Sequence, residues 1–182
     1  MNLYYNNENY VLMEQTGSEA IKLYPKSYSL LEKYAAALIN NDKFEEGIEN
    51  FYKAFELAKN NNQKVSLYIS ISDAYLKCGN WEEAINSSNK GLDISSNHPN
   101  LLLNKGYALK KQGKEYLDLI IENEDVFNTD TLLAFKYALL DNREEAIKKI
   151  VESIKKGQNI AYIKRQLEFQ EYLDEPEIKE LM

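Results

Sequence analysis

Reactive and metal-binding side chains are scarce in this chain of 182 residues. It holds one cysteine, Cys78, and one histidine, His98. A lone cysteine excludes an internal disulfide and favours the cytoplasm as the compartment, and these two residues cannot complete a zinc site. Because they fall in different predicted turns, they also make a poor nucleophile–base pair. The chain has no glycine-rich phosphate-binding loop, so we expect no metal, no cofactor and no enzymatic activity.

Features that would direct the chain to a membrane or to nucleic acid are also lacking. Residues 1–7 carry neither a basic stretch nor an apolar stretch, so we expect no signal peptide. No apolar run approaches the roughly 20 residues that a membrane helix needs. The 29 acidic residues outnumber the 22 basic ones and give a net charge of −7, which disfavours binding to phosphate backbones. We therefore expect neither a membrane nor a nucleic acid as the partner.

The scarcity of proline and glycine, at three and seven residues, favours long helices over many short strands. A short phrase, Glu-Glu-small-Ile, occurs three times, at positions 45–48, 82–85 and 144–147. Its small residues are separated by 37 and 62 residues, which fits a period of about 34 with one degenerate copy between. This period predicts an all-α fold, an α-solenoid of stacked antiparallel helix pairs. The small residues are expected where the two helices of a pair touch.

Apolar and small residues recur within each unit at i, i+3, i+4 and i+7, the spacing of an amphipathic helix. We expect one domain over residues 1–182. Its expected parts are a half repeat at 9–27, repeats at 28–64 and 65–98, a degenerate repeat at 99–126, a repeat at 127–160 and capping helices at 161–182. The second helix of the degenerate repeat is expected to be short, from Glu115 to about Asp125, because Asp118 stands where the small residue should be.

Three stretches carry a resemblance to a known repeat family. They are Tyr68-Ile71-Ser72-Tyr75-Gly79-Trp81-Ala84-Gly91, Leu31-Ala35-Leu38-Phe44-Ala54 and Asn104-Lys105-Gly106. An aromatic or leucine residue comes early and small residues stand at fixed sites, and this resembles the tetratricopeptide repeat (TPR) of small bacterial-type proteins. The resemblance implies a right-handed superhelix whose first helices line a concave groove that holds a peptide or a helix of a partner protein.

The resemblance also implies which residues line the groove. Mapped onto this chain, they are Ile69, Asp73, Leu76, Lys77, Leu103, Asn104, Tyr107, Lys110, Lys111, Leu132 and Phe135. The apolar members suit burial of an amphipathic partner helix, with the aromatic rings as anchors. Alternatively, they pack against neighbouring helices or the C-terminal segment. The lysines would attract an acidic partner, or they are only solvated.

One subset of the family clamps the carboxylate tail of heat-shock chaperones with lysine and asparagine side chains in the groove. Glu32, Ala36, Ile69 and Asp73 stand where that clamp needs these residue types, and Asn104 alone fits. The resemblance therefore does not extend to a chaperone C-terminal tail as the ligand.

Two functions fit the sequence. The first is a non-enzymatic scaffold for protein–protein interaction that recognises one partner through its concave face. The second is a small regulatory or immunity-type protein that inhibits a toxin or an enzyme by direct occlusion. The residues alone do not choose between them.

Overall fold

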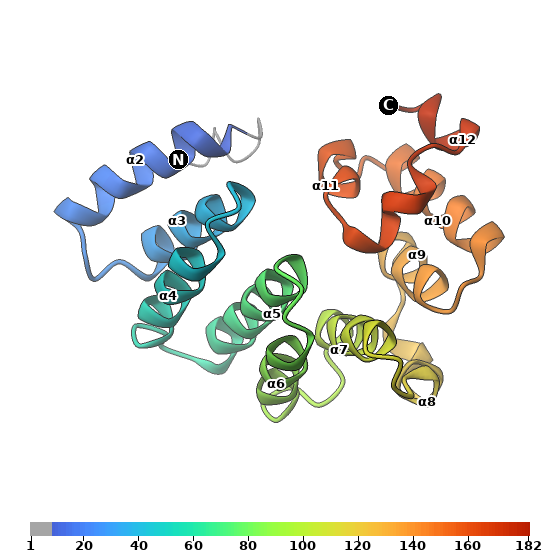
Figure 1. Ribbon diagram of the computed structural model, residues 1–182, viewed down its shortest axis with the longest axis horizontal. Coiled ribbons are helices and arrows are strands. Elements are labelled where there is room, and N and C mark those ends of the chain that lie inside the picture. Colours follow the sequence, from blue (N-terminus) through green and yellow to red (C-terminus); the bar gives the residue numbers. More distant parts are fainter. Residues whose placement is uncertain (1–8) are drawn as a thin grey trace. The chain divides into compact units, whose positions relative to one another are not determined.

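Figure 1 shows the computed structural model, which describes residues 9–182. All regular secondary structure in this range is helical, and consecutive helices pack in pairs, which confirms the predicted all-α fold. The chain folds into two compact units: unit 1 ends at Ser96, and unit 2 is Asn97–Met182. The prediction about a signal peptide concerns residues 1–7, which lie outside the described range. The expected single domain and its repeat boundaries stay predictions.

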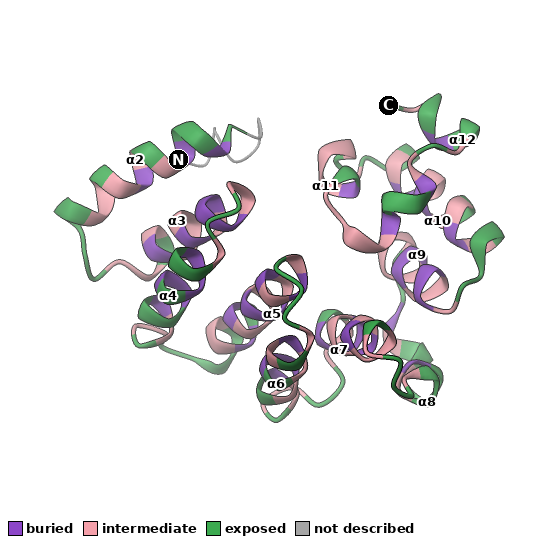
Figure 2. Ribbon diagram, viewed as in Figure 1, coloured by how far each residue is buried: buried purple, intermediate pink, exposed green. Residues whose placement is uncertain are grey.

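Unit 1 consists of one leading helix and two helix pairs. The helices are α2 (Tyr10–Leu23), α3 (Tyr28–Asn40), α4 (Phe44–Phe55), α5 (Asn61–Lys77) and α6 (Trp81–Leu92). Helix α3 packs against α4 and α5 against α6, while α2 packs on α3 and α4 on α5. Figure 2 shows buried residues along the faces where these helices meet. The buried core of the two pairs is made of Leu31, Ala35, Ile39, Ile48, Phe51, Ala54, Leu67, Ile71 and Ala74.

The small residues of the repeated phrase lie where helices touch, as the sequence predicts. A methyl group on Gly47 would lie 2.6 Å from Cδ1 of Ile39 and 3.1 Å from the Ala35 carbonyl oxygen, so a side chain there would have to displace Ile39 at the contact between α3 and α4. Ala84 on α6 and Ala146 on the later helix α10 (Arg143–Lys155) are fully buried. The repeat spacing in the sequence is therefore the spacing of helix contacts in the structure.

The glutamates of the phrase lie in the first turn of α4, α6 and α10. Carboxylates are favoured there because the unpaired N–H groups give a helix N-terminus a partial positive charge. Asn80 and Asn142 cap two of these helices, since their side chains accept hydrogen bonds from the N–H groups of Glu83 and Glu145 at 3.3 Å. The paired glutamates thus mark the start of all three helices, and asparagine caps add to that signal in α6 and α10.

The turns within these pairs also share one backbone geometry. Asp42, Gly79 and Asp141 adopt left-handed φ angles of 60°, 76° and 57°. The next residue then donates to the carbonyl five positions back, as from the Asn80 N–H to the Tyr75 oxygen at 2.9 Å. This bond closes the end of the first helix and reverses the chain.

Unit 2 is less regular. Its elements are α7 (Pro99–Lys111), α8 (Leu117–Ile121), the 3₁₀ helix η1 (Glu124–Val126), α9 (Asp130–Leu139), α10, α11 (Ile160–Lys164), the 3₁₀ helix η2 (Leu167–Tyr172) and α12 (Pro176–Lys179). Helix α7 packs against α8 and α9, α9 against α10 and η2, and α12 against α10. The prediction of one short helix from 115 to about 125 was wrong in extent, because that stretch is divided into α8 and η1. The Asn123 side chain donates to the Leu119 carbonyl at 2.9 Å, a local bond that competes with continuation of the helix.

Within residues 9–182, no helix combines the length and the apolar character that crossing a bilayer requires.

Candidate functional site

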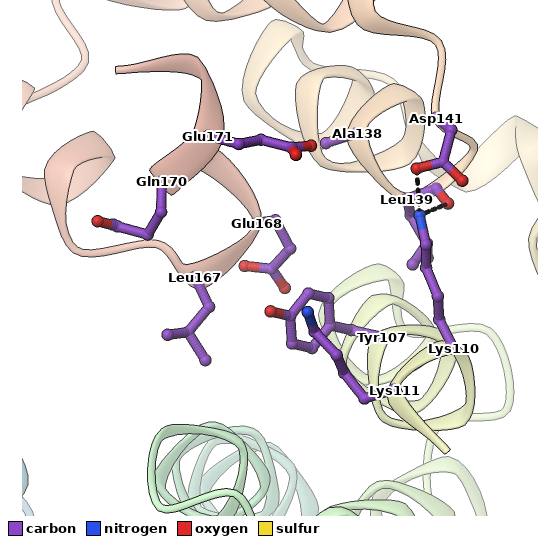
Figure 3. A pocket seen from close by; sticks show the side chains of 10 residues that line it. All are labelled: Tyr107, Lys110, Lys111, Ala138, Leu139, Asp141, Leu167, Glu168, Gln170 and Glu171. Carbon is purple, nitrogen blue, oxygen red and sulfur yellow. Dashed lines mark hydrogen bonds and ion pairs between the residues drawn. The ribbon is translucent and has the colours of Figure 1, made fainter. Parts of the chain in front are cut away.

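Unit 2 contains a cavity of about 310 Å³ between α7, the C-terminal end of α9 and η2. Ten residues line it, and Figure 3 shows their side chains. They are Tyr107, Lys110, Lys111, Ala138, Leu139, Asp141, Leu167, Glu168, Gln170 and Glu171. The charged side chains of the lining come from α7, from η2 and from Asp141 in the turn after α9.

Helix α7 presents Tyr107, Lys110 and Lys111 toward the cavity. Their i, i+3, i+4 spacing places them on one face of the helix. The position of that face depends on Gly106, where a methyl group would lie 2.8 Å from Leu139 of α9 and 3.1 Å from Ile120 of α8. Because Gly106 lacks a side chain, α7 comes close to the end of α9, and Tyr107 becomes the floor of the cavity.

The two lysines of α7 are held in different ways. The Lys110 ammonium donates to the Leu139 carbonyl at 2.9 Å and to the Asp141 carboxylate at 2.6 Å, as the dashed lines in Figure 3 mark. The Lys111 side chain is exposed, and its ammonium lies 5.1 Å from the centroid of the Tyr107 ring. Lys110 is therefore fixed by an ion pair, whereas Lys111 forms a cation–π contact at the mouth of the cavity.

The opposite wall is η2, and its geometry explains why it is acidic. A 3₁₀ helix has three residues per turn, so residues three apart lie in one row. Phe169 and Tyr172 form the row that is buried in unit 2. Glu168 and Glu171 form the adjacent row, and Figure 3 shows the Glu168 carboxylate directed toward the Tyr107 hydroxyl.

Aromatic packing holds η2 in place. The Phe169 ring stacks on Phe135 of α9 with 4.3 Å between centroids. The Arg143 guanidinium lies 5.2 Å from the centroid of the Tyr172 ring and forms an ion pair with Glu175, just beyond η2. The acidic wall is thus anchored to α9 and α10 by buried aromatic rings.

The electrostatic environment of Tyr107 reflects this wall. Burial, and then the negative charges of Glu168 and Glu171, raise the pKa of Tyr107 to about 12. Its hydroxyl therefore stays protonated at neutral pH and remains a hydrogen-bond donor. The same interaction shows that the potential at that end of the cavity is negative.

The predicted groove residues fall into different environments. Tyr107, Lys110 and Lys111 come together in the cavity, and Asn104 and Leu132 are partly exposed elsewhere in unit 2. In unit 1, Ile69 is partly exposed on α5, where Lys77 pairs with Asp73 at 3.0 Å. Leu76, Leu103 and Phe135 are buried. For these three, burial favours the alternative that the sequence left open, packing within the protein.

The acidic wall was missed by the sequence prediction, which treated residues 161–182 as capping helices. A signal was present in the alternation Glu168-Phe169 and Glu171-Tyr172, which repeats an acidic–aromatic pair after three residues. That period is typical of a 3₁₀ helix with one charged row and one buried row.

Cys78 and His98 lie at the ends of different helices. Cys78 is exposed at the end of α5, and its Sγ lies 3.4 Å from the Tyr75 carbonyl oxygen. His98 precedes α7, and burial lowers the pKa of its imidazole. Among residues 9–182, no group of three or more side chains is arranged to hold a metal ion.

Comparison with known proteins identifies a repeat family. A family model described as TPR repeat matches residues 73–113, a span that includes the end of α5, all of α6 and all of α7. No curated protein matches the chain. The match confirms the resemblance to the tetratricopeptide repeat, and no catalytic domain is identified in the chain. The expected bacterial type stays a prediction.

Proposed function

Since the chain contains a tetratricopeptide repeat, we propose that it is a non-enzymatic scaffold that binds a peptide or a helix of a partner protein along its first helices. TPR domains generally bind proteins. The observation that carries the proposal is the repeated helix pair. In its first helices, α5 and α7, most of the predicted groove residues have side chains that are at least partly exposed. A chaperone C-terminal tail is not the proposed ligand, because most of the groove positions that would need lysine or asparagine to clamp its carboxylate carry other residue types.

Accessible side chains are the proposed direct contacts. They are Ile69, Asp73, Lys77, Asn104, Tyr107, Lys110, Lys111 and Leu132. The three buried members of the predicted set are Leu76 in unit 1 and Leu103 and Phe135 in unit 2, and each would support the exposed contacts of its own unit. A cytoplasmic setting belongs to the same proposal and rests on the single, unpaired Cys78.

Tyr107 offers the clearest test of the proposal. Its ring is partly exposed on α7, and an aromatic anchor in an interface typically loses about 2 kcal/mol of binding free energy on truncation, roughly thirtyfold in affinity. We expect Tyr107→Ala to weaken binding by about that factor while the thermal midpoint changes little. Tyr24→Ala is the matched control, because Tyr24 is an exposed tyrosine at the end of α2 and outside the proposed surface.

The experiment is affinity purification from the source cell with the unaltered chain, followed by titration of the recovered partner against both variants. Equal affinities for Tyr107→Ala and Tyr24→Ala, together with no effect of Ile69→Ala or Lys111→Ala, would contradict binding along the first helices. A partner that is a toxin or an enzyme, and whose activity stops when the chain binds, would favour the inhibitor hypothesis.

A further inference from the structure

The cavity in unit 2 has an uneven balance of charge. Its lining carries two ammonium groups, from Lys110 and Lys111, and three carboxylates, from Asp141, Glu168 and Glu171. Lys110 and Asp141 neutralise each other at 2.6 Å. In the lining itself, carboxylates outnumber ammonium groups, and Glu168 and Glu171 both act on Tyr107 as negative charges, which favours a cationic guest over an anionic one.

The face of the Tyr107 ring already accommodates a cation. The Lys111 ammonium lies 5.1 Å from the ring centroid, within the distance at which the quadrupole of an aromatic ring attracts a positive charge. The Lys111 side chain is flexible and exposed, so a better cation can take its place at small cost. Lys111 therefore marks a position where a guest cation is stable.

A guanidinium group suits this position better than an ammonium group. It is planar and stacks on aromatic rings, it is more weakly hydrated, and its fork of N–H donors matches a carboxylate in two parallel bonds. Figure 3 shows the Glu168 carboxylate near the Tyr107 hydroxyl, where it supplies such an acceptor, while the Glu171 carboxylate lies farther along the lining, near Ala138. An ionised carboxylate has about four lone-pair sites, so contacts that these groups make within the protein leave room for further donors. The pKa of Tyr107 is in agreement, because the negative charges of Glu168 and Glu171 add to the effect of burial in raising it.

The size of the cavity limits what can enter it. Pockets for small ligands span about 300 to 1,000 Å³, and this cavity of about 310 Å³ is at the lower end. That volume suits one side chain of a bound segment rather than a whole helix. The remainder of the segment would lie along α7, outside the cavity.

We propose that this cavity binds an arginine side chain of the partner segment, with the guanidinium over the Tyr107 ring in place of the Lys111 ammonium and hydrogen-bonded to Glu168, while Glu171 adds negative charge to the same wall. The inference rests on the proposed function for the identity of the guest as part of a protein. It specifies the chemistry of that partner: a segment with an accessible arginine. It also gives η2 a role beyond closing the helix stack, since η2 supplies the acidic wall.

The proposal predicts changes of opposite sign for two neighbouring side chains. Glu168→Gln keeps the shape but removes an acceptor charge, and we expect it to weaken arginine binding about fivefold. Lys111→Ala removes both a competing cation and a like charge, and we expect it to strengthen binding about threefold. The matched controls are Glu177→Gln and Lys155→Ala, which make the same charge changes at exposed positions of α12 and α10 and should have no effect.

The test uses the full chain and a tripeptide, N-acetyl-Gly-Arg-Gly-amide, in a titration followed by the backbone amide NMR signals of Tyr107, Lys111 and Glu168. The reference peptide carries citrulline, which has the shape of arginine without its charge, and we expect it to bind at least fivefold more weakly. Weak absolute affinity is expected because a single side chain is presented, so the ratios between peptides and between variants are the measured quantities.

Three results would overturn the proposal. One is equal binding of the arginine and citrulline peptides, and another is the absence of localised shifts with the arginine peptide. The third is preferential binding of the corresponding glutamate peptide, weakened by Lys111→Ala, which would make the cavity a site for an acidic side chain. Because no partner protein is used, each of these outcomes refutes the arginine site alone. The proposed function is refuted separately, with the recovered partner, when Tyr107→Ala binds like the Tyr24→Ala control and Ile69→Ala and Lys111→Ala also have no effect.

Discussion

The pair α5–α6 in unit 1 and the pair α7–α8 in unit 2 solve the same packing problem differently. In unit 1, helices of 17 and 12 residues meet at Ala84, which is fully buried. In unit 2, the 13 residues of α7 have a second helix of only five residues, and Asp118, where the small residue was expected, is exposed. There Gly106 gives α7 its close contact instead, mainly with α9. A regular repeat is thus stabilised within each pair, whereas an incomplete one depends on the elements that follow it.

The elements that follow α10 supply that stabilisation in unit 2. Phe169 and Tyr172 of η2 are almost fully buried, and Ile178 of α12 is completely buried. These side chains belong to short segments that would not be stable in isolation, because forming the first turn of a helix is unfavourable. The regular helix pairs are therefore stabilised mainly by contacts between helices that follow each other in the sequence. Unit 2 depends instead on contacts between residues that are far apart in the sequence.

The largest effect should come from removing the aromatic contact of η2. Phe169→Ala deletes a fully buried ring that stacks on Phe135, and we expect a loss of about 3–5 kcal/mol in the free energy of unfolding. Denaturant unfolding measures it, with Leu23→Ala as the control because Leu23 is 75% exposed. A loss below about 1 kcal/mol would show that unit 2 does not depend on η2.

The second prediction tests the contact between paired helices directly. Ala84→Leu should overpack the α5–α6 contact and cost about 1–3 kcal/mol. Asp118→Leu, at the corresponding place in α8, should change stability by no more than about 0.5 kcal/mol because that position is exposed. Thermal melting curves of the two variants measure these changes in stability. Equal losses of stability for Ala84→Leu and Asp118→Leu would contradict the difference between the α5–α6 and α7–α8 contacts.

The third prediction compares two ion pairs. Lys110→Met removes the bonds to the Asp141 carboxylate and to the Leu139 carbonyl, and we expect a loss of about 1 kcal/mol. Lys77→Met removes a pair with Asp73 within one turn of α5, which is worth about 0.2–0.5 kcal/mol. Chemical denaturation at low salt measures both. If the loss for Lys77→Met is the larger, Lys110 does not tie α7 to the end of α9.

The smallest effect is a dependence of stability on pH at the start of α7. Burial lowers the pKa of His98 below its ordinary value of 6.5, so the unfolded chain binds a proton before the folded protein does. The stabilising contribution of neutral His98 is therefore present above pH 6.5 and is lost as the pH falls through the lowered pKa of the folded protein. His98→Gln should remove this dependence when the free energies of unfolding at pH 7.5 and just below 6 are compared. An unchanged slope in the variant would assign the dependence to another group.

Much of the regular architecture could be predicted because its signals are local. The repeated phrase marks the start of α4, α6 and α10, and the small residues Gly47, Ala84 and Ala146 lie in helix contacts as expected. The cavity could be predicted only in part. Its α7 side follows from helical spacing, but its acidic side depends on η2, whose position is fixed by the distant contact of Phe169 with Phe135. The helical period does not reveal such a contact, and a 3₁₀ segment of six residues gives little periodic signal of its own.

The left-handed turn at Asp141 has a consequence for how this sequence can evolve. Glycine adopts that conformation without strain, as Gly79 does in the corresponding turn of unit 1, so selection for stability alone would favour glycine at 141. Yet Asp141 also holds Lys110. A change to glycine would relax the turn and, in the same step, release a positive charge into the cavity, leaving two ammonium groups against two carboxylates. One substitution in a surface turn would thus shift the charge balance of the cavity without altering any residue of α7 or η2.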